Sequence, residues 1–286
     1  MRTHRLLASA ALGLGLTSLA ATASLADPVP YSSLSKSSSA ASSASRPIAR
    51  SASARAAATA PSTPRVDPDA MQALQKMSAF LSGLNSFQLQ SQTSLDVVTM
   101  QGQRLQLDGV TTYKVRRPNG FVITVDSDLK QRTFVYDGKS FTIVAPKLGY
   151  YATAAAPPTI RETLQRINDR FGVQLPLEDL FRWNDPSSAA AREQITSAFK
   201  VGTATLDGVE TDQYAFRQGD VDWQVWIQQG DQPVPRKVVI VDRTDPANPG
   251  YTARLTWTLN PGLTDADFAF RPDPGMKPIR FTASNQ

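Results

Sequence analysis

The chain has no cysteine, and its only histidine is His4. Disulfides, thiolate metal ligands, cysteine nucleophiles and a lipid-modified N-terminal cysteine are therefore excluded. After position 4 the chain also lacks the imidazole groups that zinc, copper and haem sites commonly use, and a Ser-His-Asp triad has no base. We expect no catalytic residue, no metal, no cofactor and no enzymatic activity.

An excess of charge of one sign is also lacking in the part of the chain that we expect to fold. The net charge of the whole chain is +5, but residues 67–286 hold 23 basic and 24 acidic residues. The excess lies in residues 1–66. Because nucleic-acid binding requires a basic face on a folded module, we expect no nucleic-acid partner.

A long apolar run suited to a membrane span is missing as well. The run from Leu6 to about Leu19 is interrupted by glycine, serine and threonine, and a span requires about 20 residues. Arg2 and Arg5 precede it and the small residues around Ala26 follow it, which is the layout of a secretory signal peptide. We interpret residues 1–26 as a signal peptide rather than a membrane anchor.

Residues 27–66 consist mainly of serine, alanine, proline and arginine. They contain too few large apolar side chains to form a core, so we expect a disordered linker. Its scattered positive charges are typical of a solubilising spacer, and the alternative is peripheral contact with anionic headgroups or cell-wall polymer.

Residues 67–286 are long enough for one domain with a sizeable core. Asp67-Pro68-Asp69 predicts a helix start, since apolar residues then recur at helical spacing up to Leu84. A proline-led helical crossover from Pro157 separates two series of β runs. Helices are expected in TIRETLQRINDRFG, in LPLEDLFRW and over residues 188–198. The β runs are SFQLQSQTSLDVVT, RLQLDGVTTYKVRRP, GFVITVDS, QRTFVYDG, KSFTIVAP, YYATA, KVGTATLDG, ETDQYAFRQG, DVDWQVWIQQ, PRKVVIVDR, YTARLTWTLN and DADFAFRP.

Short connections between these runs favour antiparallel neighbours. Asp137-Gly138 in FVYDGKSF predicts a tight hairpin turn, because such turns require positive φ. The runs alternate apolar and polar residues, so one sheet face is apolar, and few helices are available to cover it. The predicted fold class is α+β: a large curved antiparallel sheet of about eleven strands, an open half-barrel covered by an N-terminal helix and a central helical crossover.

Three segments carry a resemblance to a known family: DGKSFTIVAP, FGVQLPLEDLFRW, and Phe268-Ala269-Phe270 with the proline-rich end that follows. Through them, residues 67–286 resemble the periplasmic family called domain of unknown function 2092, and the lipoprotein-carrier (LolA/LppX/RseB-like) half-barrel fold. The resemblance implies a periplasmic location. It also implies a concave apolar face that relatives use to carry lipid-modified proteins or apolar lipids, or to sense envelope stress. It assigns no residue a catalytic role.

Nine aromatic residues are candidates for lining an apolar ligand cleft, and the alternative is that they fill a closed core. Trp183, at the end of LPLEDLFRW, is also placed to act as part of a lid. The candidates are Phe121, Phe134, Tyr136, Phe141, Tyr150, Tyr151, Trp183, Trp223 and Trp257.

Charged clusters are weaker candidates. The acidic pairs Glu178-Asp179, Asp126 with Asp128, and Asp220 with Asp222 are better explained by helix and turn positions than by carboxylate catalysis. The basic run Lys114–Arg117 is either a site for a phosphate or an acidic partner, or a solvated strand end that discourages edge pairing, and we favour the strand end.

The sequence therefore predicts an exported periplasmic protein, monomeric, that binds an apolar small molecule, a lipid or a lipoprotein in the concave face of a half-barrel. The alternative is an envelope protein-interaction or stress-sensor domain without a small ligand.

Overall fold

The computed structural model describes residues 66–128, 130–171 and 194–281. The predicted signal peptide, almost all of the predicted linker, the LPLEDLFRW helix and Trp183 lie outside these residues. The helices are α1 (Pro68–Gly83) and α2 (Ile160–Phe171), with 3-10 turns η1 (Pro146–Leu148) and η2 (Asp265–Phe268). The strands are β1 (Ser86–Val98), β2 (Arg104–Arg116), β3 (Gly120–Ser127), β4 (Gln131–Tyr136), β5 (Ser140–Ala145), β6 (Tyr150–Ala155), β7 (Ile195–Leu206), β8 (Val209–Gln218), β9 (Val221–Gln228), β10 (Pro235–Asp242), β11 (Gly250–Leu259) and β12 (Lys277–Pro278).

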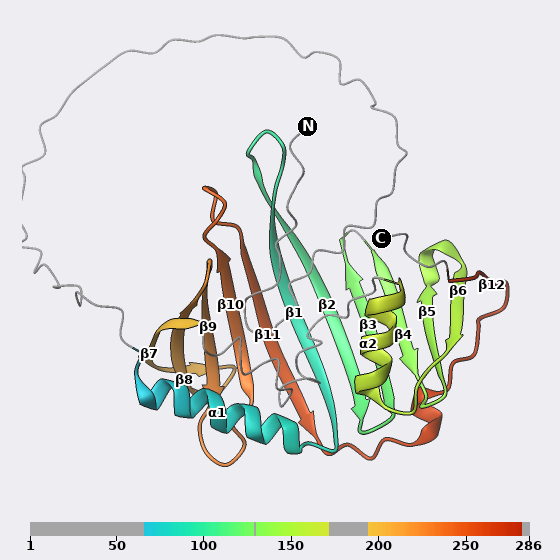
Figure 1. Cartoon of the computed structure of the whole chain (residues 1–286), viewed down its shortest axis with the longest axis horizontal. Helices are drawn as coiled ribbons and strands as arrows, with labels where there is room; N and C mark the ends of the chain where they lie inside the picture. Colours follow the sequence, from blue (N-terminus) through green and yellow to red (C-terminus); the bar gives the residue numbers. More distant parts are fainter. Residues whose placement is uncertain (1–65, 129, 172–193, 282–286) are drawn as a thin grey trace, which may run out of the picture. The chain divides into compact units, whose positions relative to one another are not determined.

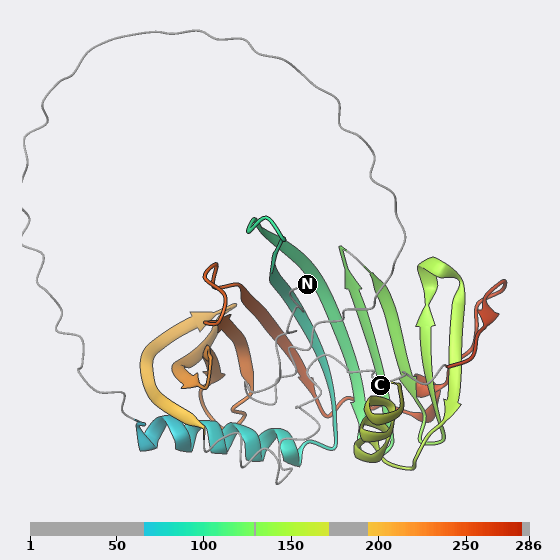
Figure 2. The ribbon, with the colours of Figure 1, turned by 45° about the horizontal axis from the view of Figure 1, so that its top comes forward.

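One sheet contains all 12 of these strands, in the order β12-β6-β5-β4-β3-β2-β1-β11-β10-β9-β8-β7. Neighbouring strands are antiparallel, apart from β12, which runs parallel to β6. The sheet stays open between β12 and β7 in the described part of the chain, and Figure 2 shows its curvature, with β7 and β8 bending over α1. The predicted α+β class and the open half-barrel are confirmed.

Helix α1 lies along one end of the strands from β7 to β1 (Figure 1). Asp67 caps its N-terminus by accepting the Asp69 N–H at 3.0 Å, and Pro68 suits the first turn because its missing N–H has no helical partner. At the other end, the Arg117 guanidinium donates to the carbonyls of Ser82 at 2.6 Å and Leu81 at 3.3 Å. The predicted N-terminal helix is thus confirmed, and Arg117, the residue directly after β2, holds its C-terminus.

Helix α2 lies over β3 and β4 in both ribbon views (Figures 1 and 2). Its first turn is fixed by the Thr159 hydroxyl, which accepts the Glu162 N–H at 3.2 Å and donates to Glu162 Oε2 at 2.8 Å. The Ile160 N–H also donates to the Pro118 carbonyl at 2.8 Å, which ties the helix to the turn before β3.

The predicted helix over residues 188–198 is wrong at its C-terminal end, because β7 begins at Ile195. Ile195 and Ala198 are both buried although they lie three positions apart, which resembles a helical spacing. The cause is a shift of register between Ile195 and Ser197, typical of a β-bulge, which changes the alternation of the strand. Residues 188–193 lie outside the described part.

The predicted strand in DADFAFRP is also wrong, since Asp265–Phe268 forms η2. Thr264 caps this turn, because its backbone N–H at 2.9 Å and its hydroxyl at 3.1 Å both donate to Oδ2 of Asp267. An acidic residue three positions after a threonine therefore outweighs the apolar alternation here.

The register separates the sheet into two faces. We call the face that packs against α1 and α2 the apolar face, and the opposite one the polar face. Two rows of paired residues cross β11, β1, β2, β3, β4, β5 and β6 on the apolar face. They are Trp257–Leu89–Tyr113–Ile123–Phe134–Ile143–Ala152 and Leu259–Phe87–Val115–Phe121–Tyr136–Phe141–Ala154. From the helices, Leu74, Met77, Leu81, Ile160, Leu164 and Ile167 complete the core.

Residues 261–281 form what we call the C-terminal strap. On the polar face, the Phe268 ring lies over Gly120 and the Phe270 ring lies 5.2 Å from Tyr151. Strand β12 then pairs with β6, and Phe281 lies 6.2 Å from Phe141 on the apolar face. The strap therefore passes around the β6 edge from one face to the other.

Candidate functional site

The apolar face brings four of the predicted aromatic residues together under α2. The Phe121 ring lies 5.3 Å from Tyr136 and 6.2 Å from Phe141, and Phe134 stacks on Phe141 at 6.4 Å. The Tyr136 hydroxyl donates to the Pro157 carbonyl at 2.5 Å, so its polar end is satisfied inside the cluster. Burial raises the pKa of Tyr136. The Asp137-Gly138 hairpin that joins β4 to β5 forms as predicted, with Gly138 at φ 88°.

Trp223 and Trp257 lie on the same face in the other half of the sheet. Trp223 stacks on Phe216 at 3.9 Å, and Trp257 lies 5.4 Å from Phe87. The Trp257 indole N–H donates to the Pro235 carbonyl at 2.8 Å. The Trp223 indole nitrogen is buried and makes no hydrogen bond within the described chain.

The two adjacent tyrosines of β6 separate. Tyr150 lies on the apolar face and is 40% exposed, whereas Tyr151 lies on the polar face against Phe270. Neighbouring residues of a strand point to opposite faces, so only one of the pair can face an apolar ligand there.

A third row on the apolar face runs from solvent into the core. Its paired residues are Leu107, Leu95, Tyr251, Ile240, Trp223 and Phe216, from six neighbouring strands. Leu95 is 37% exposed, Tyr251 is half-buried and Trp223 is 1% exposed. Beside it, Val97 and Leu105 are paired and exposed on the β1–β2 hairpin, which extends beyond its neighbours (Figure 1).

Hydroxyl groups that the sequence analysis did not single out lie near the middle of this face. Ser91 and Thr111 are paired and buried, with Tyr113 two residues further along β2. Burial raises the pKa of Tyr113 well above its usual value, and the nearby Tyr251 phenol adds to the effect. Burial raises the pKa of Tyr251 to about 12. The alternation of apolar and polar residues along the chain gave no sign that these hydroxyl groups differ from those at other strand positions.

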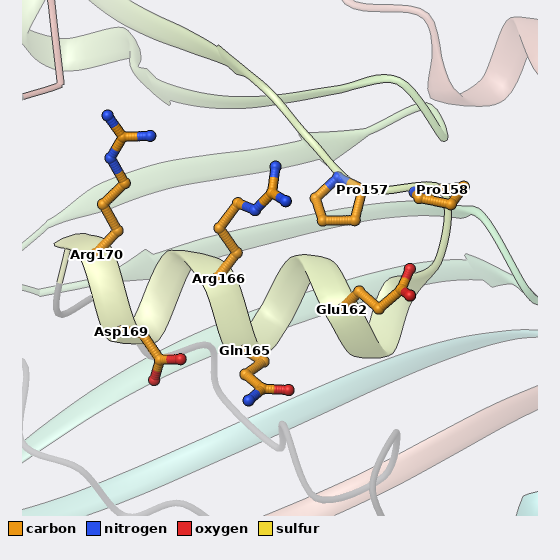
Figure 3. A pocket seen from close by; sticks show the side chains of 7 residues that line it. All are labelled: Pro157, Pro158, Glu162, Gln165, Arg166, Asp169 and Arg170. Carbon is orange, nitrogen blue, oxygen red and sulfur yellow. The ribbon is translucent and has the colours of Figure 1, made fainter.

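A groove of about 660 Å³ runs beside α2. Figure 3 shows the Arg166 and Arg170 side chains leaving the side of the helix on which Pro157 lies, while Gln165 and Asp169 leave the other side. Glu162 and Pro158 complete its lining. Pro157 connects the groove to the aromatic cluster, because its ring lines the groove and its carbonyl accepts the Tyr136 hydroxyl.

One member of each acidic pair in the described part, Asp128 and Asp222, has a structural partner. Asp128 accepts the Asp108 N–H at 2.8 Å and, with Asp126, lines a shallow groove of about 630 Å³ on the polar face. Asp222 forms a two-bond ion pair with Arg217, at 2.6 and 2.8 Å. Glu178-Asp179 lies outside the described residues. Within those residues, no three acidic or histidine side chains gather in a way that could hold a metal ion.

The basic run is not a solvated strand end, which corrects that prediction. β2 is an inner strand, and Lys114 and Arg116 pair with Asp267 at 3.3 Å and Asp265 at 2.6 Å of the strap. Arg117 lies on the opposite side, against the end of α1. The run therefore binds an acidic partner within its own chain.

The helices in the described part of the chain are all too short or too polar to cross a membrane.

Comparison with known proteins places these features in context. The model of the family described as "Predicted periplasmic protein (DUF2092)" matches residues 70–282. No curated protein matches the chain in sequence.

Among solved structures, the chain is similar to LprF from Mycobacterium bovis, with 13% identity over 74% of this chain and 99% of LprF, and a TM-score of 0.43. LppX from Mycobacterium tuberculosis has 14% identity over 68% and 97%, with a TM-score of 0.38. A LolA superfamily protein from Nitrosomonas europaea has 11% identity over 70% and 97%, with a TM-score of 0.32.

Proposed function

The chain belongs to the DUF2092 family of predicted periplasmic proteins, and we propose that it binds an apolar ligand on the apolar face of its sheet. The ligand class is an acyl chain, a lipid or the lipid part of a lipoprotein. One observation carries the proposal: the row from Leu107 to Phe216 continues without a polar break other than the Tyr251 hydroxyl, from exposed Leu95 to buried Trp223.

Exposed apolar side chains that continue a core provide the driving force for such a ligand. Each Å² of apolar surface removed from water contributes about 25 cal/mol, and each buried methylene group about 0.8 kcal/mol. An acyl chain laid along Leu95, Val97 and Leu105 would cover surface that the two described helices leave exposed. Single exposed apolar side chains are ordinary, but these three lie on adjacent strands of one face and form a patch.

A matched pair of variants tests this proposal. Leu95→Asp places a carboxylate on the apolar face, and Val110→Asp places one on the polar face of the neighbouring strand, where the starting exposure is nearly the same, 37% against 36%. A buried carboxylate must lose its hydration, so Leu95→Asp should weaken binding of a pyrene-labelled fatty acid about tenfold or more. Val110→Asp should leave that binding unchanged.

The natural ligand is sought by native mass spectrometry of protein purified from periplasm without detergent, beside a solvent extract. A bound mass that reappears in the extract as a lipid supports the proposal. An apo mass that stays unchanged after incubation with a lipid extract contradicts it, as does equal loss of fatty-acid binding in both variants.

The second candidate function is docking of an envelope protein without a small ligand. It is favoured by β7, an edge strand of the described sheet on which Phe199 is 48% and Val201 is 50% exposed. An edge with exposed apolar side chains offers backbone groups to an added strand. Two results together would favour this function over lipid binding. The purified protein would carry no lipid, and Val201→Lys would abolish its binding to a periplasmic protein.

A further inference from the structure

Arg166 is a cation without an ionic partner in the described part of the chain. It is exposed on the outer face of α2 and lines the groove beside that helix (Figure 3). Its expected partner is Glu162, because a glutamate four residues before an arginine is the favourable order for a helical ion pair. That pair does not form, since the Glu162 carboxylate instead accepts the Thr159 hydroxyl at 2.8 Å.

A second arginine borders the same groove. Arg170 lies one turn further along α2, and its side chain leaves the helix on the same side as that of Arg166 (Figure 3). Residues four apart on a helix are neighbours on its surface, so Arg170 marks the continuation of the wall that Arg166 begins. Asp169, the other carboxylate of the lining, points away from Arg166 in Figure 3, and no ion pair joins the two in the described part of the chain.

Guanidinium groups favour phosphate oxygens, because the planar fork of donors matches two oxygens at once. Pro157 lies between this wall and the aromatic cluster, with its ring in the groove and its carbonyl bonded to Tyr136. We propose that the α2 groove binds the phosphate group of a ligand whose apolar part lies on the apolar face. This inference rests on the proposed function and narrows the ligand to an anionic phospholipid, with a free phosphate ester as the other source of the same chemistry.

The test compares two lipids with equal tails. Calorimetry measures binding of monomeric dihexanoyl phosphatidylglycerol and dihexanoyl phosphatidylcholine to the exported protein. The variants are Arg166→Gln and, as a control, Arg161→Gln, an exposed arginine of the same helix that does not line the groove. Both variants remove one positive charge, so a general loss of net charge affects them equally. Glycerol 3-phosphate and inorganic phosphate are titrated in parallel.

The expected result is a preference for phosphatidylglycerol of about tenfold or more, which falls in Arg166→Gln and with added salt, and persists in Arg161→Gln. Equal binding of both lipids, or equal effects of the two variants, overturns the inference and leaves the proposed function standing. Phosphate binding that depends on Arg166, without binding of either lipid, keeps the phosphate site and rejects the proposed function. No binding of any probe rejects both.

Discussion

Phe268 gives the sharpest test of whether the C-terminal strap is part of the folded domain. Its ring is 1% exposed and lies on Gly120, where an added Cβ would come within 2.9 Å of it. The guanidinium of Arg116, at the end of β2, lies 4.9 Å from the centroid of the Phe268 ring. Phe268→Ala removes the ring, and Gly120 has no side chain to fill the space. Truncation of a buried phenylalanine costs about 3–5 kcal/mol, a large part of the roughly 5–15 kcal/mol that stabilises a domain.

The measurement is the free energy of unfolding in urea, followed by tryptophan fluorescence. Trp223 and Trp257 lie on β9 and β11, far along the sheet order from the Phe268 contact with β3, so a loss seen there is a loss of the whole domain. The control is Phe270→Ala, which removes a half-buried ring of the same strap and should cost less than about 1.5 kcal/mol. A cost for Phe268→Ala below about 1 kcal/mol, or equal to that of the control, would refute the reasoning.

Two more variants test the anchoring of α1 and the environment of the apolar face. Arg117→Gln removes the guanidinium donors to the last carbonyls of α1, so the free energy of unfolding should fall by about 1.5–3 kcal/mol. Arg117→Lys keeps the positive charge at the helix C-terminus and should recover part of this loss. Unchanged midpoints of urea unfolding would contradict the prediction. For Tyr251, the folded pKa is about 12 against a usual 10.0, so the neutral phenol stabilises the fold below pH 10 and this contribution is lost as pH rises toward 12. Two pKa units correspond to about 2.7 kcal/mol, and the stability of the native chain relative to Tyr251→Phe should fall by about that amount between pH 9 and pH 12. A difference between the two proteins that does not change with pH would show that Tyr251 is not desolvated.

Much of the sheet could be predicted because its strands are regular and glycine or proline marks their ends. Trp223, Val225 and Ile227 lie on one face as the alternation predicted. The failures occur where local hydrogen bonds or a bulge interrupt that pattern. The bulge after Ile195 produced a helix-like spacing, and the capping of Asp265–Phe268 by Thr264 replaced a predicted strand.

The sequence indicated that aromatic residues form the candidate site, but it did not indicate how they and the charged residues around them are arranged. Alternation places Tyr150 and Tyr151 on opposite faces, yet it cannot say which face the helices cover. Whether Arg166 forms an ion pair depends on whether the Glu162 side chain turns toward it or toward Thr159. Both arrangements are compatible with the same sequence. The partners of Lys114 and Arg116 lie about 150 positions away in the strap, beyond the reach of any local pattern.

The apolar face depends on pairing between segments that are distant in the chain. β1 pairs with β11, which joins Leu95 to Tyr251, and α1 is held to β7 by the Asp67 N–H, which donates to the Ala198 carbonyl at 2.8 Å. The N-terminal helix therefore covers the C-terminal half of the sheet, while α2 covers the N-terminal half. The C-terminal half therefore takes its cover from the start of the chain, whereas the N-terminal half is covered by the helix that directly follows β6. A ligand on the row from Leu107 to Phe216 touches strands of both halves, so its binding free energy must stabilise the domain as a whole rather than either half alone.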